Sequence, residues 1–467
     1  THNLGVINQI ADRVGIMYAG EILESGPTDS VFSNPANPYT QGLLAALPQS
    51  NDRELKPIPG QIADLRSIPD GCIFADRCEF ARGECRSGSI PLEPVEGDED
   101  HLSRCVRSEH ALANPIAADE TRRTTAATED PSTLIEVTDV KKHYGEQSLL
   151  DRFLDGEPPV KAVDGVSFRV SEAESLGIVG ESGCGKSTLG SLLLNLKSPT
   201  AGEVAVEGTT FEEMDESDWR RFRSECQVVF QNPHSSLNPK HTVGQAIKRP
   251  LDMFTDMDSD EKRNRVADLL DQVGLHPDYA KRYPEDLSGG EKQRVAIARA
   301  FSVNPSFVVL DAPVSALDVS IQASILNLLK ELQAEYGTSY LLISHDFSVV
   351  NYLSDRIAVM YLGEFVEVGP TDSVFDPPYH PYTRALLSNI LTTDPSERTA
   401  QTHLEGDVPS ARDPPSGCSF HTRCPQKIGD VCERDEPVLD GTDTDHDHHR
   451  IACHLDREEM VPEEDLV

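Results

Sequence analysis

The chain has 467 residues, and its 79 Asp and Glu outnumber its 42 Lys and Arg, which gives a formal net charge of −37. A field of this sign repels phosphate backbones, so we expect no nucleic-acid partner. The length exceeds one ordinary domain, and the chain contains no run of about eighteen apolar residues that could cross a bilayer.

The acidic excess is spread along the chain, and most of the basic residues are Arg. This pattern is typical of proteins from a high-salt cytoplasm, where surface carboxylates hold water and salt screens their repulsion. An acidic surface on a protein from an ordinary environment is the alternative. No charged-then-apolar segment opens the chain, so we expect a cytoplasmic protein.

The two ends of the chain resemble each other. The segment that begins THNLGVINQIADRVGIMYAG at Thr1 aligns without gaps to SHDFSVVNYLSDRIAVMYLG at Ser344. About half of the positions are identical, which indicates an internal repeat. Only the second copy is preceded by a complete front end. We therefore expect the C-terminal part of a tandem protein whose first unit lacks its beginning; a two-domain protein with a short N-terminal module is the alternative.

The repeat predicts five segments along the chain. They are the remnant of a first unit at 1–50, a Cys-rich extension at 51–110, a linker at 111–132, a complete unit at 133–392, and a second Cys-rich extension with an acidic tail at 393–467. The linker is predicted because ALANPIAADETRRTTAATEDPS is small, polar and Pro-containing.

The complete unit contains a phosphate-binding loop. The apolar run SLGIV at 175–179 predicts a buried strand, GESGCGKST follows at 180–188, and the apolar stretch at 189–196 predicts a helix. Backbone N–H groups of such a loop surround phosphate oxygens, and the helix N-terminus adds a positive dipole. We expect Lys186 to reach the β and γ phosphates and Ser187 to help hold Mg²⁺. The predicted nucleotide-binding residues here are Gly180, Glu181, Ser182, Gly183, Cys184, Gly185, Lys186, Ser187 and Thr188.

A second apolar run, FVVL at 307–310, predicts a strand that ends in Asp311. A carboxylate at the C-terminal end of a strand beside the phosphate loop lies where Mg²⁺ and its water need an acceptor. We therefore expect Asp311 in the catalytic site.

Further motifs carry a family resemblance. LSGGEKQR at 287–294 resembles the signature motif of the ABC ATPases, and SALD at 315–318 resembles their D-loop. Gln231 in VFQNPHSSLNP is similar to the Q-loop glutamine, His345 after LLIS to the switch histidine, and Tyr144 in KKHYG to the aromatic residue that stacks on adenine.

The resemblance covers nearly all of 133–390. It implies ATP and Mg²⁺ as cofactors and an α/β fold of the P-loop NTPase class. Such a fold has a parallel sheet core, an antiparallel β subdomain and a helical subdomain that bears the signature. We expect the Cys-rich extensions in addition to this fold.

The resemblance also implies roles for these residues. In the family, two domains pack head to tail and hold nucleotide between one phosphate loop and the other domain's signature. Ser288, Gly289 and Gly290 start a helix, so their N–H groups suit a γ-phosphate presented by another domain. Gln231 would contact Mg²⁺, and His345 would orient the attacking water. We expect two ABC domains of the full-length chain to pair, with His2 of the first unit as the counterpart of His345.

One position departs from the family. The family places Glu directly after the strand-terminal Asp as general base, whereas LDAPVSALD places Ala312 there. Loss of a general base costs about 10² to 10⁴ in rate. We expect a degenerate site at this phosphate loop and an active one formed by this chain's signature, the missing phosphate loop and His2. Engineering to trap ATP is the alternative explanation for Ala312.

Eight of the ten cysteines form two quartets with similar spacing, GCIFADRC opening one and GCSFHTRC the other. The quartets are Cys72, Cys78, Cys85 and Cys105, and Cys418, Cys424, Cys432 and Cys453. Four thiolates suit zinc or a [4Fe–4S] cluster, but the tight Cys-x2-4-Cys spacing of zinc sites is absent. The segments resemble the C-terminal extension of oligopeptide and dipeptide transporter ATPases, which implies an iron–sulfur cluster. Zinc and disulfides are the alternatives.

The remaining cysteines and a His-rich segment have simpler interpretations. Cys184 lies inside the phosphate loop, where we expect a small filler without a redox role. DHDHHR at 445–450 could bind metal, but an exposed, solvated turn is the favoured interpretation. Too little apolar sequence surrounds the quartets for an independent core, so a metal would serve as a structural staple.

The function expected from these motifs is that of an ATP-binding subunit of a peptide-type ABC importer, peripheral on the cytoplasmic face of the plasma membrane. Its partners would be integral membrane permease subunits, contacted by loops at 231–239, and through them a solute-binding protein. Dipeptide, oligopeptide and nickel remain open as solutes. The alternatives are a soluble iron–sulfur ABC ATPase that acts on the ribosome or nucleic acid, and a non-hydrolysing regulatory nucleotide-binding module, motivated by Ala312.

Overall fold

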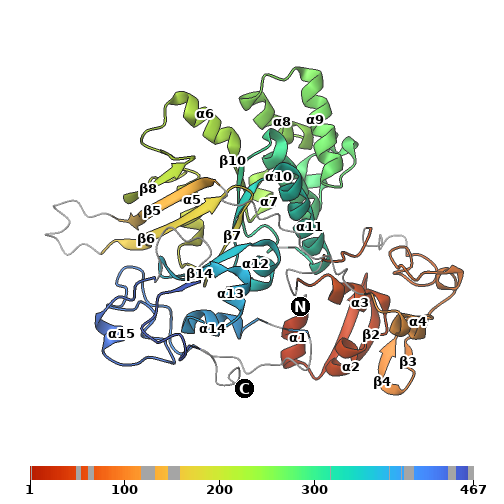
Figure 1. Cartoon of the computed structure of the whole chain (residues 1–467). Helices are drawn as coiled ribbons and strands as arrows, with labels where there is room; N and C mark the ends of the chain where they lie inside the picture. Colours follow the sequence, from red (N-terminus) through yellow and green to blue (C-terminus); the bar gives the residue numbers. More distant parts are fainter. Residues whose placement is uncertain are drawn as a thin grey trace. The chain divides into compact units, whose positions relative to one another are not determined.

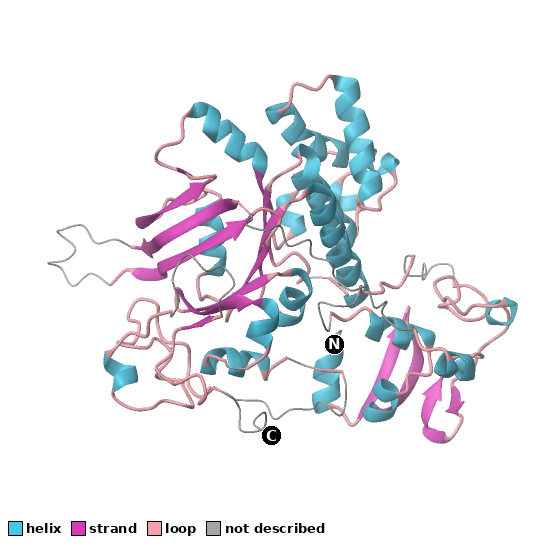
Figure 2. Cartoon of the chain, viewed as in Figure 1, coloured by secondary structure: helices cyan, strands magenta, loops and turns pink. Residues whose placement is uncertain are grey.

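The structure is a computed structural model of the chain (Figures 1 and 2). It describes residues 1, 3–48, 54–60, 68–116, 132–145, 158–315, 317–377, 379–390, 392–393, 404–439 and 449–460. The chain divides into two compact units. The first comprises Thr1–Thr124, Leu317–Asn327 and Asn389–Ala400, and the second comprises Thr125–Ala316, Leu328–Ser388 and Gln401–Val467.

The first unit is built on a four-stranded antiparallel sheet of order β1-β2-β4-β3. Its elements are α1 (Leu4–Ile10), β1 (Arg13–Tyr18), β2 (Glu21–Pro27), α2 (Thr28–Ser33), α3 (Pro38–Ala45), the 3-10 turn η1 (Gly83–Arg86), β3 (Glu93–Val95), β4 (Asp98–Ser103) and α4 (Ser108–Ala113). β1 alternates exposed and buried residues, with Val14, Ile16 and Tyr18 inward, as a strand with one solvated face should.

This sheet joins two segments that the sequence separates. β4 belongs to the predicted Cys-rich extension at 51–110, yet it pairs with β2 of the predicted remnant at 1–50. Leu23 of the first segment and Phe74 of the second belong to one small hydrophobic core, so the two segments pack together. Helix α4 extends into the predicted linker at 111–132, of which residues 117–131 lie outside the described part of the chain.

The second unit contains a seven-stranded sheet of order β10-β11-β12-β7-β13-β14-β15. Its strands are β7 (Ser175–Val179), β10 (Cys226–Val229), β11 (Phe307–Asp311), β12 (Ser339–Ile343), β13 (Arg356–Tyr361), β14 (Glu364–Pro370) and β15 (Arg450–Ile451). The first five in spatial order are parallel, and β14 and β15 pair antiparallel at one edge. β7 and β12 are buried along their whole length, which explains their continuous apolar sequences.

A second, antiparallel sheet of order β6-β5-β8-β9 completes the β structure of this unit. Its strands are β5 (Thr133–Tyr144), β6 (Val160–Ser171), β8 (Ala201–Val206) and β9 (Thr209–Thr210). One hydrophobic core joins the two sheets: Val137 and Phe168 from the antiparallel sheet share it with Leu176 and Ile178 from β7 and Leu189 from the helix that follows.

The helices of the second unit, which include the second half of α11, surround the parallel sheet and form a separate helical subdomain. They are α5 (Lys186–Leu193), α6 (Glu216–Glu225), α7 (Pro233–Ser236), α8 (Val243–Phe254), α9 (Ser259–Gln272), α10 (Gly289–Ala300), α11 (Val319–Tyr336), α12 (Phe347–Leu353), α13 (Thr371–Phe375), α14 (Pro381–Leu387) and α15 (Val431–Arg434), with 3-10 turns η3 (Pro277–Lys281), η4 (Pro284–Asp286) and η5 (Phe301–Val303). α8 contacts α9 and α10, and α10 bears the signature. The predicted α/β fold with these three parts is confirmed.

The internal repeat is visible in the backbone. The hairpin β1–β2 has the same strand lengths and antiparallel pairing as β13–β14. Each hairpin has one register shift, between Ile16 and Met17 in the first and between Val359 and Met360 in the second. A bulge at the same place in both copies shows that they share local geometry as well as sequence.

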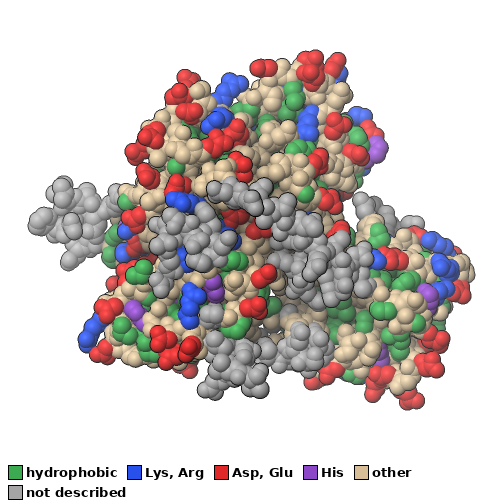
Figure 3. Space-filling view, in the orientation of Figure 1, with side chains coloured by type: hydrophobic (Ala, Val, Ile, Leu, Met, Phe, Trp, Pro, Cys, Tyr) green, Lys and Arg blue, Asp and Glu red, His purple; other side chains and the backbone are tan. Residues whose placement is uncertain are grey.

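Acidic side chains are spread over the visible face. Where the structure describes the residues, Asp and Glu are scattered among Lys, Arg and uncharged side chains rather than gathered into one patch (Figure 3). Within the described residues, no helix combines the length and apolarity needed to cross a bilayer.

Candidate nucleotide site

The phosphate loop connects β7 to α5 and depends on its glycines. Gly180 and Gly185 have φ angles of 151° and 115°, which favour glycine. A Cβ atom at Gly180 would lie 2.2 Å from the Met360 carbonyl oxygen, and one at Gly185 would lie 2.1 Å from the Ala162 carbonyl oxygen. The loop can therefore pass between neighbouring backbones only without side chains at these two positions.

Helix α5 begins at Lys186, three residues before the predicted start at Leu189, and ends at Leu193 rather than at Leu196. Gly185 caps the helix in a left-handed conformation, so the helix starts directly from the loop. Asn195, with a φ angle of 47°, prevents the helix from continuing to the predicted end. The first turn of α5 thus lies where its N–H groups can face phosphate.

Lys186 folds back onto its own loop. Its Nζ donates to the carbonyl oxygens of Gly180 at 2.6 Å and Glu181 at 2.9 Å. Backbone oxygens of the loop therefore hold the ammonium group in place. Cys184 is buried in the core beneath the loop, in agreement with its predicted role as a filler.

Ser187 and Asp311 form the other side of the site. The Ser187 hydroxyl donates to a carboxylate oxygen of Asp311 at 3.3 Å. Burial raises the pKa of Asp311, and Ser187 and Lys186 oppose that rise. β11 ends in Asp311 as predicted, and although β12 separates β11 from β7, the Asp311 carboxylate contacts the phosphate loop at Ser187. A hydroxyl and a carboxylate are hard oxygen ligands, and the pair fits Mg²⁺.

Ala312 occupies the position at which the family places its general base. Its φ angle is 45°, which is unusual for a residue with a side chain, and its N–H donates to the Ile343 carbonyl oxygen at 2.8 Å. The Ser315 hydroxyl donates to the Ala312 carbonyl oxygen at 3.2 Å, and the Gln231 amide lies 3.5 Å from that hydroxyl. Gln231 lies two residues beyond the end of β10.

Tyr144 lies near the other end of the phosphate loop. Burial would raise its pKa, but hydrogen bonds with Lys197 and Thr188 outweigh that effect and lower it. The Lys197 Nζ donates to the Tyr144 hydroxyl at 2.7 Å, and the Lys142 Nζ lies 5.4 Å from the ring centroid. The contact with Thr188 brings together the predicted adenine-stacking residue and the phosphate loop.

The signature forms the N-terminus of α10. The Ser288 hydroxyl accepts from the Glu291 N–H at 3.3 Å, and the Glu291 carboxylate accepts from the Ser288 N–H at 2.8 Å. This capping box fixes the helix start and leaves Ser288 exposed, as contact with a second domain requires. His345 lies exposed after the end of β12, and its predicted counterpart His2 lies outside the described residues.

The structure adds two residues that sequence reasoning missed. The Tyr382 hydroxyl accepts from the Glu181 N–H at 2.9 Å. The Arg423 guanidinium donates to both carboxylate oxygens of Glu181, at 2.7 and 3.2 Å. Tyr382 belongs to the sequence HPYT at 380–383 and Arg423 to GCSFHTRC, and neither sequence by itself indicates a contact with the loop.

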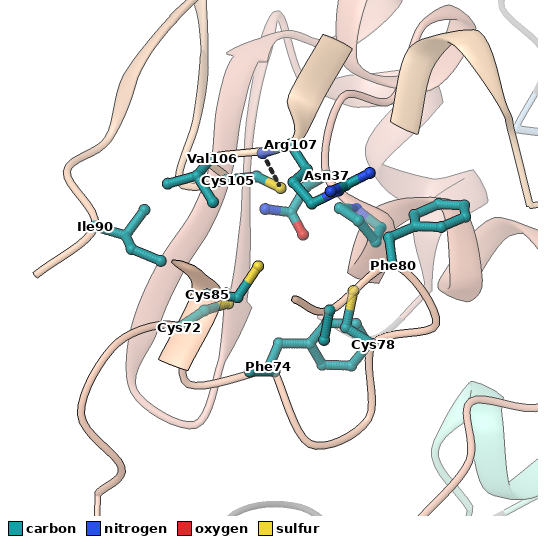
Figure 4. A pocket seen from close by; sticks show the side chains of 13 residues that line it. Asn37, Cys72, Phe74, Cys78, Phe80, Cys85, Ile90, Cys105, Val106 and Arg107 are labelled. Atoms are coloured by element: carbon teal, nitrogen blue, oxygen red, sulfur yellow. Dashed lines mark hydrogen bonds between the residues drawn. The ribbon is translucent and has the colours of Figure 1, made fainter. Parts of the chain in front are cut away.

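The first cysteine quartet surrounds one small cavity of about 20 Å³ (Figure 4). The four side chains turn toward the same space, which apolar residues such as Phe74 and Ile90 also line. Burial raises the pKa of Cys78 to about 11 and that of Cys105 to about 12.

The second quartet has similar surroundings. Burial raises the pKa of Cys418 to about 12 and that of Cys424 to about 11, and nearby thiols of the same quartet add to both shifts. All ten cysteines, each within the described residues, are free thiols. Among those residues no group of three or more His, Cys, Asp or Glu is placed to hold a metal ion. The four-thiol donor sets suit a metal, but the predicted metal sites are not formed in this arrangement.

In both copies, a close approach of two backbone segments explains why a Gly precedes the first cysteine of the quartet. The Cys72 N–H donates to the Cys85 carbonyl oxygen at 2.8 Å, and the Cys418 N–H donates to the Cys432 carbonyl oxygen at 2.9 Å. A Cβ atom on the preceding residue, Gly71 or Gly417, would lie 2.5 or 2.6 Å from that same carbonyl oxygen. Each loop closes because this residue has no side chain.

The interpretation of DHDHHR as an exposed turn is wrong for its described part. His449 forms a hydrogen bond of 2.6 Å to Glu367, and only 10% of its side chain is exposed. The pairing of β15 with β14 places this ring against the buried carboxylate. Residues 445–448 lie outside the described part of the chain.

Comparisons with known proteins identify the class. The family described as "ABC transporter" matches residues 163–315, which include the phosphate loop, the signature and Asp311. The family described as "Oligopeptide/dipeptide transporter, C-terminal region" matches twice, at residues 23–85 and 366–432. The fold and site therefore define an ABC-type ATPase, an enzyme that hydrolyses ATP with Mg²⁺.

Individual relatives show which kind of ABC ATPase the chain resembles. The chain is 46% identical over 322 residues to the "Probable peptide ABC transporter ATP-binding protein y4tS" of Sinorhizobium fredii, covering 69% of this chain and 90% of that protein. It is 45% identical over 332 residues to OppF of Escherichia coli, an oligopeptide transport ATP-binding protein, covering 70% of this chain and 98% of that protein.

The OppD protein of Mycobacterium tuberculosis, also an oligopeptide transport ATP-binding protein, is 42% identical over 406 residues. That match covers 85% of this chain but 65% of the mycobacterial protein. The chain belongs to the family of ATP-binding proteins of oligopeptide and dipeptide ABC transporters.

Proposed function

We propose that this chain energises the import of peptides as the ATP-hydrolysing component of an ABC transporter. The observation that carries the proposal is the contact between the two regions that define the family. The C-terminal region characteristic of oligopeptide and dipeptide transporters holds the phosphate loop through Tyr382 and Arg423. The names of the relatives, which refer to peptide and oligopeptide transport, support peptides over nickel as the solute.

In the proposed cycle, the N–H groups at the start of α5 and the Lys186 ammonium bind the β and γ phosphates of ATP. Ser187 and Asp311 supply oxygen ligands for Mg²⁺, which neutralises phosphate charge when bound. Tyr144 stacks against adenine. Ser288, Gly289 and Gly290 present their N–H groups to the nucleotide of a second ABC domain, so that ATP brings two domains together and hydrolysis releases them.

The proposed partners are permease subunits in the membrane and, through them, a solute-binding protein. The chain would lie on the cytoplasmic face of the membrane. The segment after β10 supports this assignment, because it carries Gln231 next to the nucleotide and exposes Phe230, whose side chain is 40% accessible. An exposed aromatic residue beside a nucleotide-sensing glutamine is suited to transmit closure to a membrane subunit.

The experiment is affinity purification of the chain from detergent-solubilised membranes of its source cells, followed by reconstitution into vesicles. We expect integral membrane proteins to copurify and ATP to drive the uptake of labelled peptides. Lys186→Ala is the matched control, because it should abolish uptake and leave copurification intact. Copurification with ribosomes or nucleic acid instead of membrane proteins would support the soluble alternative and overturn the proposal.

We further propose that the nucleotide site of this chain is the degenerate member of an asymmetric pair. Ala312 is its basis, since a methyl group accepts no proton. In Ala312→Glu of the full-length protein, ATP turnover is expected to rise by up to about 10² to 10⁴ if this site limits the rate. Ala312→Gln, which has nearly the same shape without a carboxylate, should give no rise. An unchanged rate in Ala312→Glu would show that this site does not limit turnover.

We also propose that each cysteine quartet binds a [4Fe–4S] cluster as a structural staple. The donor set of the first quartet supports it: its four thiols, with Cys85 buried and the others half-buried, face one space that Phe74 and Ile90 also line. Iron and acid-labile sulfide analysis of anaerobically purified protein is expected to find two clusters per chain. Zinc at one ion per quartet, or disulfides resistant to mild reduction, would replace this proposal by one of its alternatives.

A further inference from the structure

The second Cys-rich region contacts the phosphate loop at a single residue from two directions. The Tyr382 hydroxyl accepts from the N–H of Glu181, and Arg423 donates two hydrogen bonds to its carboxylate. A guanidinium with both arms on a carboxylate fixes its orientation as well as balancing its charge. Backbone and side chain of Glu181 are therefore both held by residues outside the nucleotide-binding motifs.

The contact is rigid on the Arg423 side. Only 7% of the Arg423 side chain is exposed, against 28% for Glu181. Burial raises the pKa of the neighbouring Tyr361, and Arg423 partly offsets that rise. The rings of Tyr361 and Tyr382 each lie 5.3 Å from the ring of Phe420, three residues before Arg423. This aromatic packing fixes the segment that presents the guanidinium.

The charge of Glu181 makes this contact matter for nucleotide binding. Its carbonyl oxygen lies 2.9 Å from the Lys186 Nζ, so the residue is part of the cradle for phosphate. An unpaired carboxylate there would repel the polyphosphate of ATP, and the repulsion would be strong because the site is partly shielded from water. Arg423 supplies the opposite charge and fixes the orientation of the carboxylate.

We propose that Arg423 and Tyr382 are positioning residues of the ATP site, through which the Cys-rich region sets the affinity of the phosphate loop for nucleotide. Arg423 directly precedes Cys424, so the conformation of the cysteine loop determines where the guanidinium lies. The Cys-rich region thereby acts on the ATP site as well as supporting the fold. The proposal depends on nucleotide binding by this chain and not on the transported solute.

The first copy provides a matched control. Arg77 directly precedes Cys78, as Arg423 precedes Cys424. It donates to the carbonyl oxygens of Pro59 at 2.7 Å and Ile58 at 3.1 Å and lies 3.4 Å from the Tyr18 hydroxyl. None of these partners belongs to the phosphate loop, so a change at Arg77 removes an equivalent arginine without touching Glu181.

The test is the affinity of the 467-residue chain for the fluorescent analogue mant-ATP in the presence of Mg²⁺. Arg423→Met is expected to raise Kd about tenfold, within the range of energetic coupling between adjoining sites. Adding Glu181→Gln should restore Kd to within about twofold, because it removes the uncompensated charge. Arg77→Met should leave Kd unchanged. A structural defect alone would not be reversed by Glu181→Gln.

A milder variant covers the case in which Arg423→Met does not fold. Arg423→Lys keeps the charge but loses the two-armed geometry, so Kd should rise about threefold, again reversed by Glu181→Gln. An unchanged Kd in the Arg423 variants, or a rise that Glu181→Gln does not reverse, would overturn the proposal.

Discussion

The two copies of the C-terminal region differ in what they contact, although their internal packing is nearly the same. Each has an aromatic trio with ring centroids about 5 Å apart; the trios are Tyr18, Tyr39 and Phe74, and Tyr361, Tyr382 and Phe420. Each also has a buried Glu–His pair, Glu24 with His101 at 2.7 Å and Glu367 with His449 at 2.6 Å.

The difference lies at the arginine before the second cysteine. Arg423 pairs with the Glu181 carboxylate, whereas Arg77 donates to the carbonyl oxygens of Ile58 and Pro59. The aromatic trio, the Glu–His pair and the cysteine loop are thus sufficient to build the scaffold. In the second copy, the arginine of this scaffold contacts the phosphate loop.

The largest effects are expected at the glycines that let the cysteine loops close. Gly71→Ala and Gly417→Ala each place a Cβ atom within 2.6 Å of a carbonyl oxygen and impose a positive φ on Ala, so each should destabilise its unit by more than about 3 kcal/mol. Denaturant unfolding measures this loss. Only Gly417→Ala should also weaken mant-ATP binding.

Gly88→Ala is the control for these two variants. Its φ angle is 75°, but a Cβ atom there has nothing within 4 Å, so the cost should be about 1 kcal/mol. If Gly88→Ala lowers the unfolding free energy as much as Gly71→Ala and Gly417→Ala do, the close backbone approach has no energetic consequence.

The next effect depends on pH and distinguishes the copies. Burial raises the pKa of Glu364 from 4.5 to about 7, and the carboxylates of Glu436 and Asp164 add to the shift against the opposing effect of Lys161. The folded protein therefore binds a proton that the unfolded chain releases, and stability falls as pH rises from about 4.5 through 7.

Glu364→Gln should remove this dependence and stabilise the protein at pH 8 by up to about 3 kcal/mol. The measurement is the unfolding free energy at pH 5 and pH 8. Glu21, the equivalent residue of the first copy, has a side chain that is 42% exposed, so Glu21→Gln should change stability by less than about 0.5 kcal/mol at either pH. If the unfolding free energy of Glu364→Gln changes between pH 5 and pH 8 as much as that of the unsubstituted protein, the assignment of this pH dependence to Glu364 is wrong.

A smaller effect is expected at the tyrosines of the trios. Tyr382→Phe removes the acceptor of the Glu181 N–H, and the loss of one hydrogen bond of about 1 kcal/mol corresponds to a roughly fivefold rise in Kd for mant-ATP. Tyr39→Phe makes the same change in the first copy and should leave Kd unaltered. If both variants raise Kd for mant-ATP equally, the two copies do not differ in their effect on the nucleotide site.

The smallest and most general effect concerns the acidic surface, which both copies share. If the charge of −37 is an adaptation to high salt, solubility and mant-ATP binding should improve between low and molar KCl, because salt screens repulsion among the carboxylates. Titrations in a KCl series measure this. Loss of folding at molar KCl would exclude the adaptation.

Local sequence predicted the parts of the site that are contiguous in the chain. The strand before the phosphate loop was predicted with its observed bounds, Ser175–Val179, because buried parallel strands have continuous apolar sequences. The start of α5 was missed, since the left-handed conformation of Gly185 depends on the neighbouring Ala162 backbone. Dependence on a distant strand is not visible in a local pattern.

The contacts that hold Glu181 could not be predicted from the sequence for the same reason. Tyr382 lies 201 residues from Glu181 and Arg423 lies 242 residues away. Their motifs could be recognised as family features, but no spacing rule connects them to the loop. His449 was misjudged because its partner, Glu367, lies on a strand 82 residues earlier.

The position of the last cysteine in each quartet has a consequence for the order of folding. In each copy the first three cysteines lie close together in the sequence, whereas Cys105 follows β4 and Cys453 follows β15, strands that pair with the much earlier β2 and β14. Pairings between strands distant in sequence form late, because the long loop between them must close first. Each quartet is therefore completed late in folding. A complete quartet indicates that the strand before its last cysteine has already paired with its sheet.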